Sequence, residues 1–97
     1  MVIKNKVQRH AEICNSLNEL YARKNHDYGD SFHTTFVEEG MAMPRIRLSD
    51  KFNRFKMLSR KDAKAMVKES IIDTLLDLAN YAIMTVMELE DTRYDAK

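Results

Sequence analysis

The feature that most constrains the fold is an apolar stretch, residues 69–92, which contains no lysine or arginine but sets three acids and an asparagine three or four residues apart along its first half. In an α-helix, with about 100° per residue, these four side chains fall within an arc of about 80°, and the apolar side chains fill an arc of about 160° beside them. A helix this apolar is expected to be buried, and carboxylates at its margin are costly unless a cation faces them. The four polar residues are Glu69, Asp73, Asp77 and Asn80.

The residues that break helices are confined to one region, because both glycines and the single proline lie within residues 29–44. On either side of that region apolar residues recur at helical spacing, and no segment alternates as a strand does. The sequence therefore predicts an all-α fold, a small helical bundle of three long helices and one short helix, completed by oligomerisation. We expect one domain over residues 1–97, with residues 25–43 as a connecting loop region.

The helix boundaries follow from residue preferences. Apolar periodicity predicts a first helix over residues 2–24, Gly40 is expected to interrupt the chain, and Pro44 is suited to the first turn of the next helix. Asp62 is a candidate N-cap for the last helix, with a break near Lys68. The side chains expected to face inward from the helix that Pro44 opens are Leu48, Phe52, Phe55 and Leu58.

The net charge of +1 conceals two neighbouring blocks of opposite sign. Residues 45–68 carry nine lysines and arginines against two acids, whereas residues 69–91 carry six acids and no base. Such blocks favour pairing within the chain or between subunits, so we expect no strong binding to duplex nucleic acid. Acids interrupt the one candidate for a membrane span, the N-terminus has no apolar signal-peptide core, and a single cysteine forms no internal disulfide. These features predict a cytoplasmic protein with no membrane partner.

The three carboxylates of this stretch, Glu69, Asp73 and Asp77, form an acidic stripe that has two interpretations. Carboxylates spaced four residues apart on a bundle helix can hold a divalent metal, and oxygen ligands suit Mg²⁺ or Mn²⁺. Alternatively, Glu69, Asp73 and Asp77 pair with cations of the preceding helix. On the metal interpretation, replacing Asp73 or Asp77 with alanine is expected to leave stability unchanged or raise it. His26 and His33 do not show a convincing metal-ligand spacing, and from spacing alone pairing with the preceding helix is the more common outcome for such acids.

The basic strip consists of Arg47, Lys51 and Arg54, which follow one another at helical spacing. Their side chains can converge on one phosphate, and arginine offers bidentate geometry. A solvated face, or pairing with the acidic stripe, explains the same spacing. A third segment, residues 24–32, is dense in hydrogen-bonding side chains and includes an aromatic ring, although such Asn, Asp and Gly clusters are also good turn formers.

Three segments together resemble a known family. The segments KNHDYGDSF, RLSDKFNRFKML and ESIIDTLLDLANYAIM resemble the phage and bacterial family called nucleotide modification associated domain 1, and the similarity runs from about residue 10 to residue 90. That resemblance implies a link to modified nucleotides or their precursors.

More distantly, the layout is similar to the all-α nucleoside triphosphate pyrophosphatases of the MazG and dimeric dUTPase type. By that resemblance, Glu69, Asp73 and Asp77 match an acidic helix that holds Mg²⁺. The first acidic helix of those enzymes reads Glu-x-x-Glu, whereas the corresponding residues 45–58 contain Asp50 as their only carboxylate. Fewer acids weaken metal binding, and the cations that replace them favour an anionic ligand.

The leading interpretation is a self-associating protein, a dimer or tetramer, that binds a nucleotide between the helix of the basic strip and the helix of the acidic stripe. Whether it also hydrolyses the nucleotide to a monophosphate and pyrophosphate with Mg²⁺ stays open. Glu69, Asp73 and Asp77 are the predicted metal ligands. Two alternatives stay open: a phage protein that sequesters a nucleotide signal of host defence without catalysis, and a structural or interaction bundle. The predicted nucleotide-binding residues are Arg47, Lys51, Arg54, Asn25, Asp27, Tyr28 and Asn80.

Overall fold

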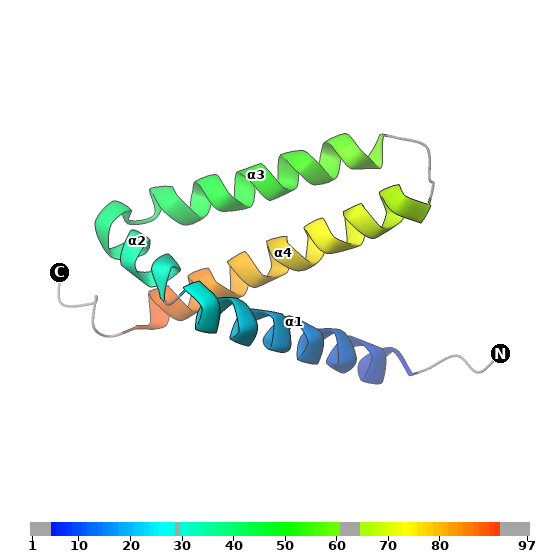
Figure 1. Cartoon of the computed structure of the whole chain (residues 1–97), viewed down its shortest axis with the longest axis horizontal. Coiled ribbons are helices and arrows are strands. Elements are labelled where there is room, and N and C mark those ends of the chain that lie inside the picture. The colour runs from blue at the N-terminus through cyan, green and yellow to red at the C-terminus, as the bar shows by residue number, and fades with distance from the viewer. Residues whose placement is uncertain (1–4, 29, 61–64, 92–97) are drawn as a thin grey trace. The chain divides into compact units, whose positions relative to one another are not determined.

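The computed structural model describes the backbone of residues 5–28, 30–60 and 65–91, and the side chains of these residues other than 27, 28, 65 and 66. Within these ranges the chain forms four helices and no strand, so the all-α class is confirmed (Figure 1). The helices are α1 (Lys6–Tyr28), α2 (Ser31–Glu39), α3 (Ala42–Ser59) and α4 (Ala65–Glu90). The chain divides into two compact units, Met1–Asp30 with α1 and Ser31–Lys97 with α2, α3 and α4.

Helix α1 begins at a side-chain cap and continues further than expected. The Asn5 Oδ1 atom accepts hydrogen bonds from the backbone N–H groups of Val7 at 2.7 Å and Gln8 at 3.4 Å, which satisfies two donors of the first turn. The helix then runs through Asn25 to Tyr28, residues that we assigned to the connecting loop. No glycine or proline precedes position 29, so the helix has no reason to end at Lys24.

The turn between α2 and α3 depends on Gly40, as the sequence predicts. Gly40 has φ +67°, a left-handed conformation that residues with a side chain seldom adopt. Its N–H donates to the Phe36 carbonyl at 2.8 Å, and its own carbonyl accepts from the Met43 N–H at 3.2 Å. Pro44 follows in the first turn of α3 and is fully buried. Part of the predicted loop, residues 31–39, is thus the short helix of the bundle.

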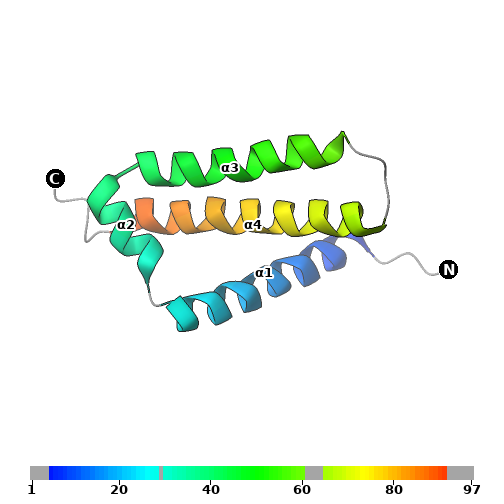
Figure 2. The same ribbon diagram turned by 45° about the horizontal axis from the view of Figure 1, so that its top comes forward.

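Helices α3 and α4 lie side by side and antiparallel, and α2 contacts both of them (Figures 1 and 2). The register follows from two contacts, Lys51 with Asp77 and Arg54 with Thr74, because three residues forward on α3 correspond to three residues back on α4. The hydroxyl groups of two buried threonines of α4 are both hydrogen-bonded. Thr74 donates to the Ser70 carbonyl and Thr85 to the Tyr81 carbonyl, each at 2.7 Å.

The inward face of α3 differs from the expectation at one position. Leu58 is buried and Leu48 and Phe55 are half-buried, whereas Phe52 is 50% exposed, with Lys56 Nζ 5.0 Å from its ring centroid. The inward arc is centred near Lys51 and Phe55, and at about 100° per residue Phe52 falls at its margin. The contact with α4 therefore includes a lysine at the place where the pattern suggested a phenylalanine.

Helix α4 is continuous past Lys68, and much of its apolar surface is exposed. Its segment Val67–Glu90 is long and apolar enough to cross a membrane by length and composition alone, with a mean hydropathy of 1.2, and 11% of its most apolar 18-residue stretch is buried. The core helix of a soluble protein can meet the same criterion. This segment was not expected from the sequence, because Asp73 and Asp77 interrupt its apolar run.

Candidate functional site

An ion pair lies at the contact between α3, which carries the basic strip, and α4, which carries the acidic stripe. Lys51 Nζ lies 3.0 Å from Asp77 Oδ2, and the two side chains are 27% and 28% exposed. Neither charge is fully removed from water, so the pair avoids the full desolvation penalty of a deeply buried one. For Asp77, the interpretation that the acids pair with the preceding helix is thus realised.

Beside this pair, Arg54 is held by a buried hydroxyl. Its Nε donates to Thr74 Oγ1 at 3.2 Å, and Thr74 is 2% exposed. Because the threonine hydroxyl donates in turn to the Ser70 carbonyl, its lone pairs are oriented toward the arginine. Arg54 itself is exposed, and the two NH₂ groups of its guanidinium form the planar fork that recognises phosphate. The fold therefore holds the guanidinium of Arg54 at its Nε atom, and the side chain remains exposed.

The other predicted residues on α3 and α4 are less enclosed. Arg47, Glu69 and Asp73 are exposed, and Asn80 is half-buried one turn beyond Asp77. Asp77 has a further interaction besides the Lys51 contact, and Asn80 has an interaction of its own. The structure therefore brings Lys51, Arg54 and Asp77 to one contact, with Arg47, Glu69 and Asp73 on accessible surface.

The predicted contacts from the first helix are not placed at this contact. Asn25 is exposed near the end of α1 and belongs to the other compact unit. Asp27 and Tyr28 lie in the same helix, but their side chains are outside the described residues. Their proposed role with the base or sugar stays a prediction.

Three potential metal ligands gather elsewhere within the part of the chain that the structure describes. They are His33 of α2 with Glu88 and Asp91 at the end of α4, whose ligand atoms all lie within 4.8 Å of one another. The predicted trio, Glu69, Asp73 and Asp77, does not form such a group among these residues. The sequence showed no convincing metal-ligand spacing for His33, and the partner that it meets in the structure, Glu88, lies 55 residues away. The spacing of Glu88 and Asp91, three residues apart, was the available signal.

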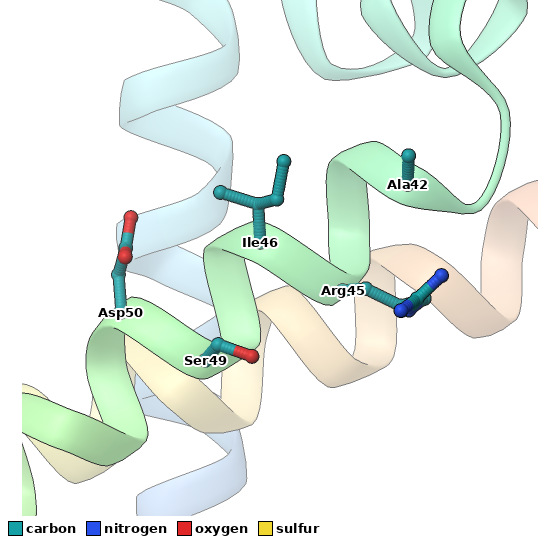
Figure 3. Close-up of a pocket in the computed structure, with 5 residues that line it drawn as sticks. All are labelled: Ala42, Arg45, Ile46, Ser49 and Asp50. Atoms are coloured by element: carbon teal, nitrogen blue, oxygen red, sulfur yellow. The ribbon is translucent and has the colours of Figure 1, made fainter.

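A shallow hollow lies on another face of α3 (Figure 3). At about 100° per residue its lining residues are centred about 110° from Arg54 around the helix, and Arg45 lies about 180° from Arg54. It contains none of the predicted nucleotide-binding residues. The residues that line it are Ala42, Arg45, Ile46, Ser49 and Asp50.

Comparison with known proteins gives one match. A family model described as nucleotide modification associated domain 1 matches residues 24–89, which include α2, α3 and most of α4. No curated protein and no solved structure matches the chain. The match includes the Lys51–Asp77 pair, Arg54 and Thr74, and it ends two residues before Asp91.

Proposed function

We propose, from the premise that the chain belongs to the nucleotide modification associated domain 1 family, that it binds a nucleotide through the contact between α3 and α4. The observation that carries the proposal is the fixed Arg54 guanidinium beside the Lys51–Asp77 pair. Arg47 lies on the same helix two turns before Arg54 and adds a second exposed guanidinium. These cations supply charge for one or two phosphates.

The cost of ordering supports Arg54 as the main phosphate ligand. A free arginine side chain loses much rotamer entropy when it binds a ligand, and the Thr74 hydrogen bond has already imposed part of that loss. Lys51 has a different role, because its ammonium is engaged by Asp77 and must share its hydrogen bonds with any phosphate. Asn80, half-buried on the same helix as Asp77, is the proposed contact to base or sugar.

Binding without hydrolysis is the form that the geometry favours. A Mg²⁺ ion held by Glu69, Asp73 and Asp77 would require Asp77 to release Lys51, and two of the three carboxylates are exposed. A nucleotide phosphate could draw Lys51 away and free Asp77 for the metal. The pyrophosphohydrolase activity thus depends on that exchange, whereas sequestration of a nucleotide does not.

We also propose that a second copy of the chain covers the apolar surface of α4. Four large side chains, at 41–52% exposure, fall within an arc of about 80° on this helix. An apolar stripe of this kind is unfavourable in water, and a twofold dimer pairs it with an identical stripe. The arrangement agrees with a cytoplasmic protein and requires no membrane partner. The four side chains are Ile72, Leu75, Ile83 and Val86.

A ligand panel tests the function. Mononucleotides, dinucleotides and cyclic nucleotides are added to the protein with and without Mg²⁺ or Mn²⁺, and the melting temperature is measured. Metal-independent stabilisation supports nucleotide binding alone, and metal-dependent stabilisation with release of pyrophosphate supports hydrolysis. The absence of any shift across the panel would reject both and leave a structural bundle.

Substitutions then locate the site. Arg54→Ala combined with Lys51→Ala should abolish the nucleotide response while the far-ultraviolet circular dichroism stays helical. The matched control is Arg45→Ala, which removes an exposed arginine from the opposite face of the same helix. An equal loss in the control would show a general charge effect and contradict the assigned site.

A further inference from the structure

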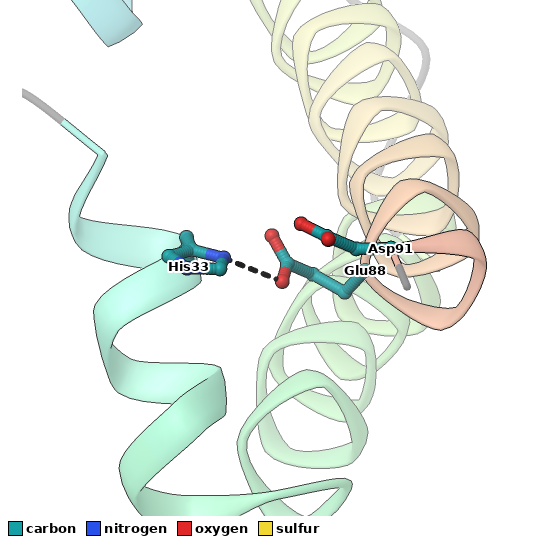
Figure 4. Close-up of side chains that lie close together, drawn as sticks. All are labelled: His33, Glu88 and Asp91. Atoms are coloured by element: carbon teal, nitrogen blue, oxygen red, sulfur yellow. Dashed lines mark hydrogen bonds and ion pairs between the residues drawn. The ribbon is translucent and has the colours of Figure 1, made fainter. Parts of the chain in front are cut away.

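Outside the proposed nucleotide site, one imidazole and two carboxylates converge where α2 meets the end of α4. His33 Nδ1 lies 2.9 Å from Glu88 Oε1, with side chains that are 17% and 11% exposed. Asp91 is half-buried, and its backbone N–H donates to the Glu88 carbonyl at 3.2 Å, which places it one turn from Glu88. The three side chains point toward one another in Figure 4.

The electrostatic setting of this cluster favours a cation. The carbonyl groups at the C-terminal end of a helix carry partial negative charge, and α4 ends here with Glu88, Glu90 and Asp91 in place of the basic residues that usually stabilise such an end. Helix α2 contains no lysine or arginine either. Two carboxylates, a helix end and an imidazole nitrogen therefore meet where neither α2 nor the last turn of α4 contributes a lysine or arginine.

We propose that His33, Glu88 and Asp91 form a binding site for a divalent transition-metal ion, with Zn²⁺ as the preferred occupant. Zinc is bound at about 2.0–2.2 Å by histidine nitrogen and carboxylate oxygen, which in tetrahedral geometry separates the ligand atoms by about 3.3–3.5 Å. The three atoms already lie within 4.8 Å of one another, so movements of about 1 Å complete the site.

The donor set limits which class of metal is bound. Imidazole suits zinc, copper and nickel, whereas Mg²⁺ and Ca²⁺ prefer oxygen alone, so this cluster differs in selectivity from the carboxylates of the acidic stripe. Three protein ligands leave a fourth position for water or for an anionic group. The ion replaces the His33–Glu88 hydrogen bond and joins α2 to α4, within one compact unit of the chain.

The competing explanation is that His33 and Glu88 form only an ion pair that joins the two helices. That explanation predicts that Zn²⁺ neither binds nor stabilises the protein. The two explanations therefore differ in their response to Asp91→Asn, which leaves the His33–Glu88 pair intact.

The experiment measures binding of Zn²⁺ alone by calorimetry, and the visible absorption of Co²⁺ as a report of coordination by nitrogen. The wild-type chain should bind one ion with an imidazole-dependent signal. His33→Gln and Asp91→Asn should each weaken binding about 100-fold, at the upper end of the losses seen when residues that support metal ligands are changed. Glu90→Gln, an exposed acid at the same helix end, is the matched control and should bind as the wild type does.

Two further variants make the result specific. His10→Gln removes the histidine near Cys14, whose Sγ lies 3.6 Å from His10 Nδ1 on exposed α1, and Asp77→Asn removes the acid of the proposed nucleotide site. Both should retain zinc. The proposal is overturned if the wild type does not bind Zn²⁺, if binding is lost in His10→Gln, or if His33→Gln and Asp91→Asn bind as tightly as the wild type.

Discussion

The Lys51–Asp77 pair should contribute measurably to stability. At 3.0 Å the attraction is about 5.5 kcal/mol for an effective dielectric constant of about 20 and about 1.4 kcal/mol in bulk water. Desolvation and loss of side-chain entropy oppose it, and each side chain keeps over a quarter of its surface exposed. We therefore expect a coupling energy of about 1–2 kcal/mol, between the values for surface and buried pairs.

A double-mutant cycle measures that energy. Asp77→Asn keeps the shape of the side chain and removes its charge, Lys51→Met removes the ammonium, and the double variant closes the cycle. The free energy of unfolding is determined by urea titration, followed by circular dichroism at one fixed protein concentration. Asp73→Asn, an exposed acid one turn earlier on α4, is the control and should change stability by less than about 0.5 kcal/mol.

The outcome decides between two expectations. The acidic stripe by itself predicts that loss of either aspartate leaves stability unchanged or raises it, because mutual repulsion is relieved. The Lys51 contact reverses this expectation for Asp77 and leaves it in place for exposed Asp73. A coupling energy below about 0.3 kcal/mol, or equal effects at both aspartates, would refute the reasoning.

Three other predictions follow from single positions. Gly40→Ala should destabilise the protein by about 1–2 kcal/mol in urea titration because of the left-handed backbone, although a Cβ atom there meets nothing within 4 Å, and Gly40→Asn should cost less. Thr74→Val, which keeps the side-chain volume, should remove the acceptor that orients Arg54 and lower stability by about 1 kcal/mol. A nucleotide affinity equal to that of the wild type would show that Arg54 needs no such support. Ile83→Glu should convert the proposed dimer to a monomer of 11.4 kDa in light scattering, and a wild-type chain that already has this mass at micromolar concentration would contradict the dimer.

Local properties were predictable because they depend on neighbouring residues. The absence of glycine and proline from the flanking regions predicted the long helices, and the only glycine with a described positive φ lies at the predicted break, Gly40. The end of α1 was less predictable. Asn25 to Tyr28 favour turns by type, but nothing in the chain opposed one more helical turn.

The candidate site was predictable in part. Helical periodicity placed Lys51 and Arg54 on one strip and Asp77 on another, and pairing between the two helices was one of the two interpretations of their opposite charges, beside a metal site. The role of Thr74 was missed, because nothing in the sequence indicates that a threonine within an apolar helix will accept a hydrogen bond from an arginine of another helix. The displacement of Phe52 from the inward face has the same origin, since a shift of about 40° in how two helices meet exchanges marginal residues for central ones.

The sequence by itself determined where this chain is helical and which faces carry charge, because helix propensity and periodicity depend on residues within one or two turns. Only the tertiary structure decided that His33 meets Glu88 and Asp91, since that contact joins residues 55 or more positions apart. The antiparallel register of α3 and α4, together with the turn at Gly40, positions α2 against the end of α4. No local pattern encodes that distance, because it results from the packing of whole helices.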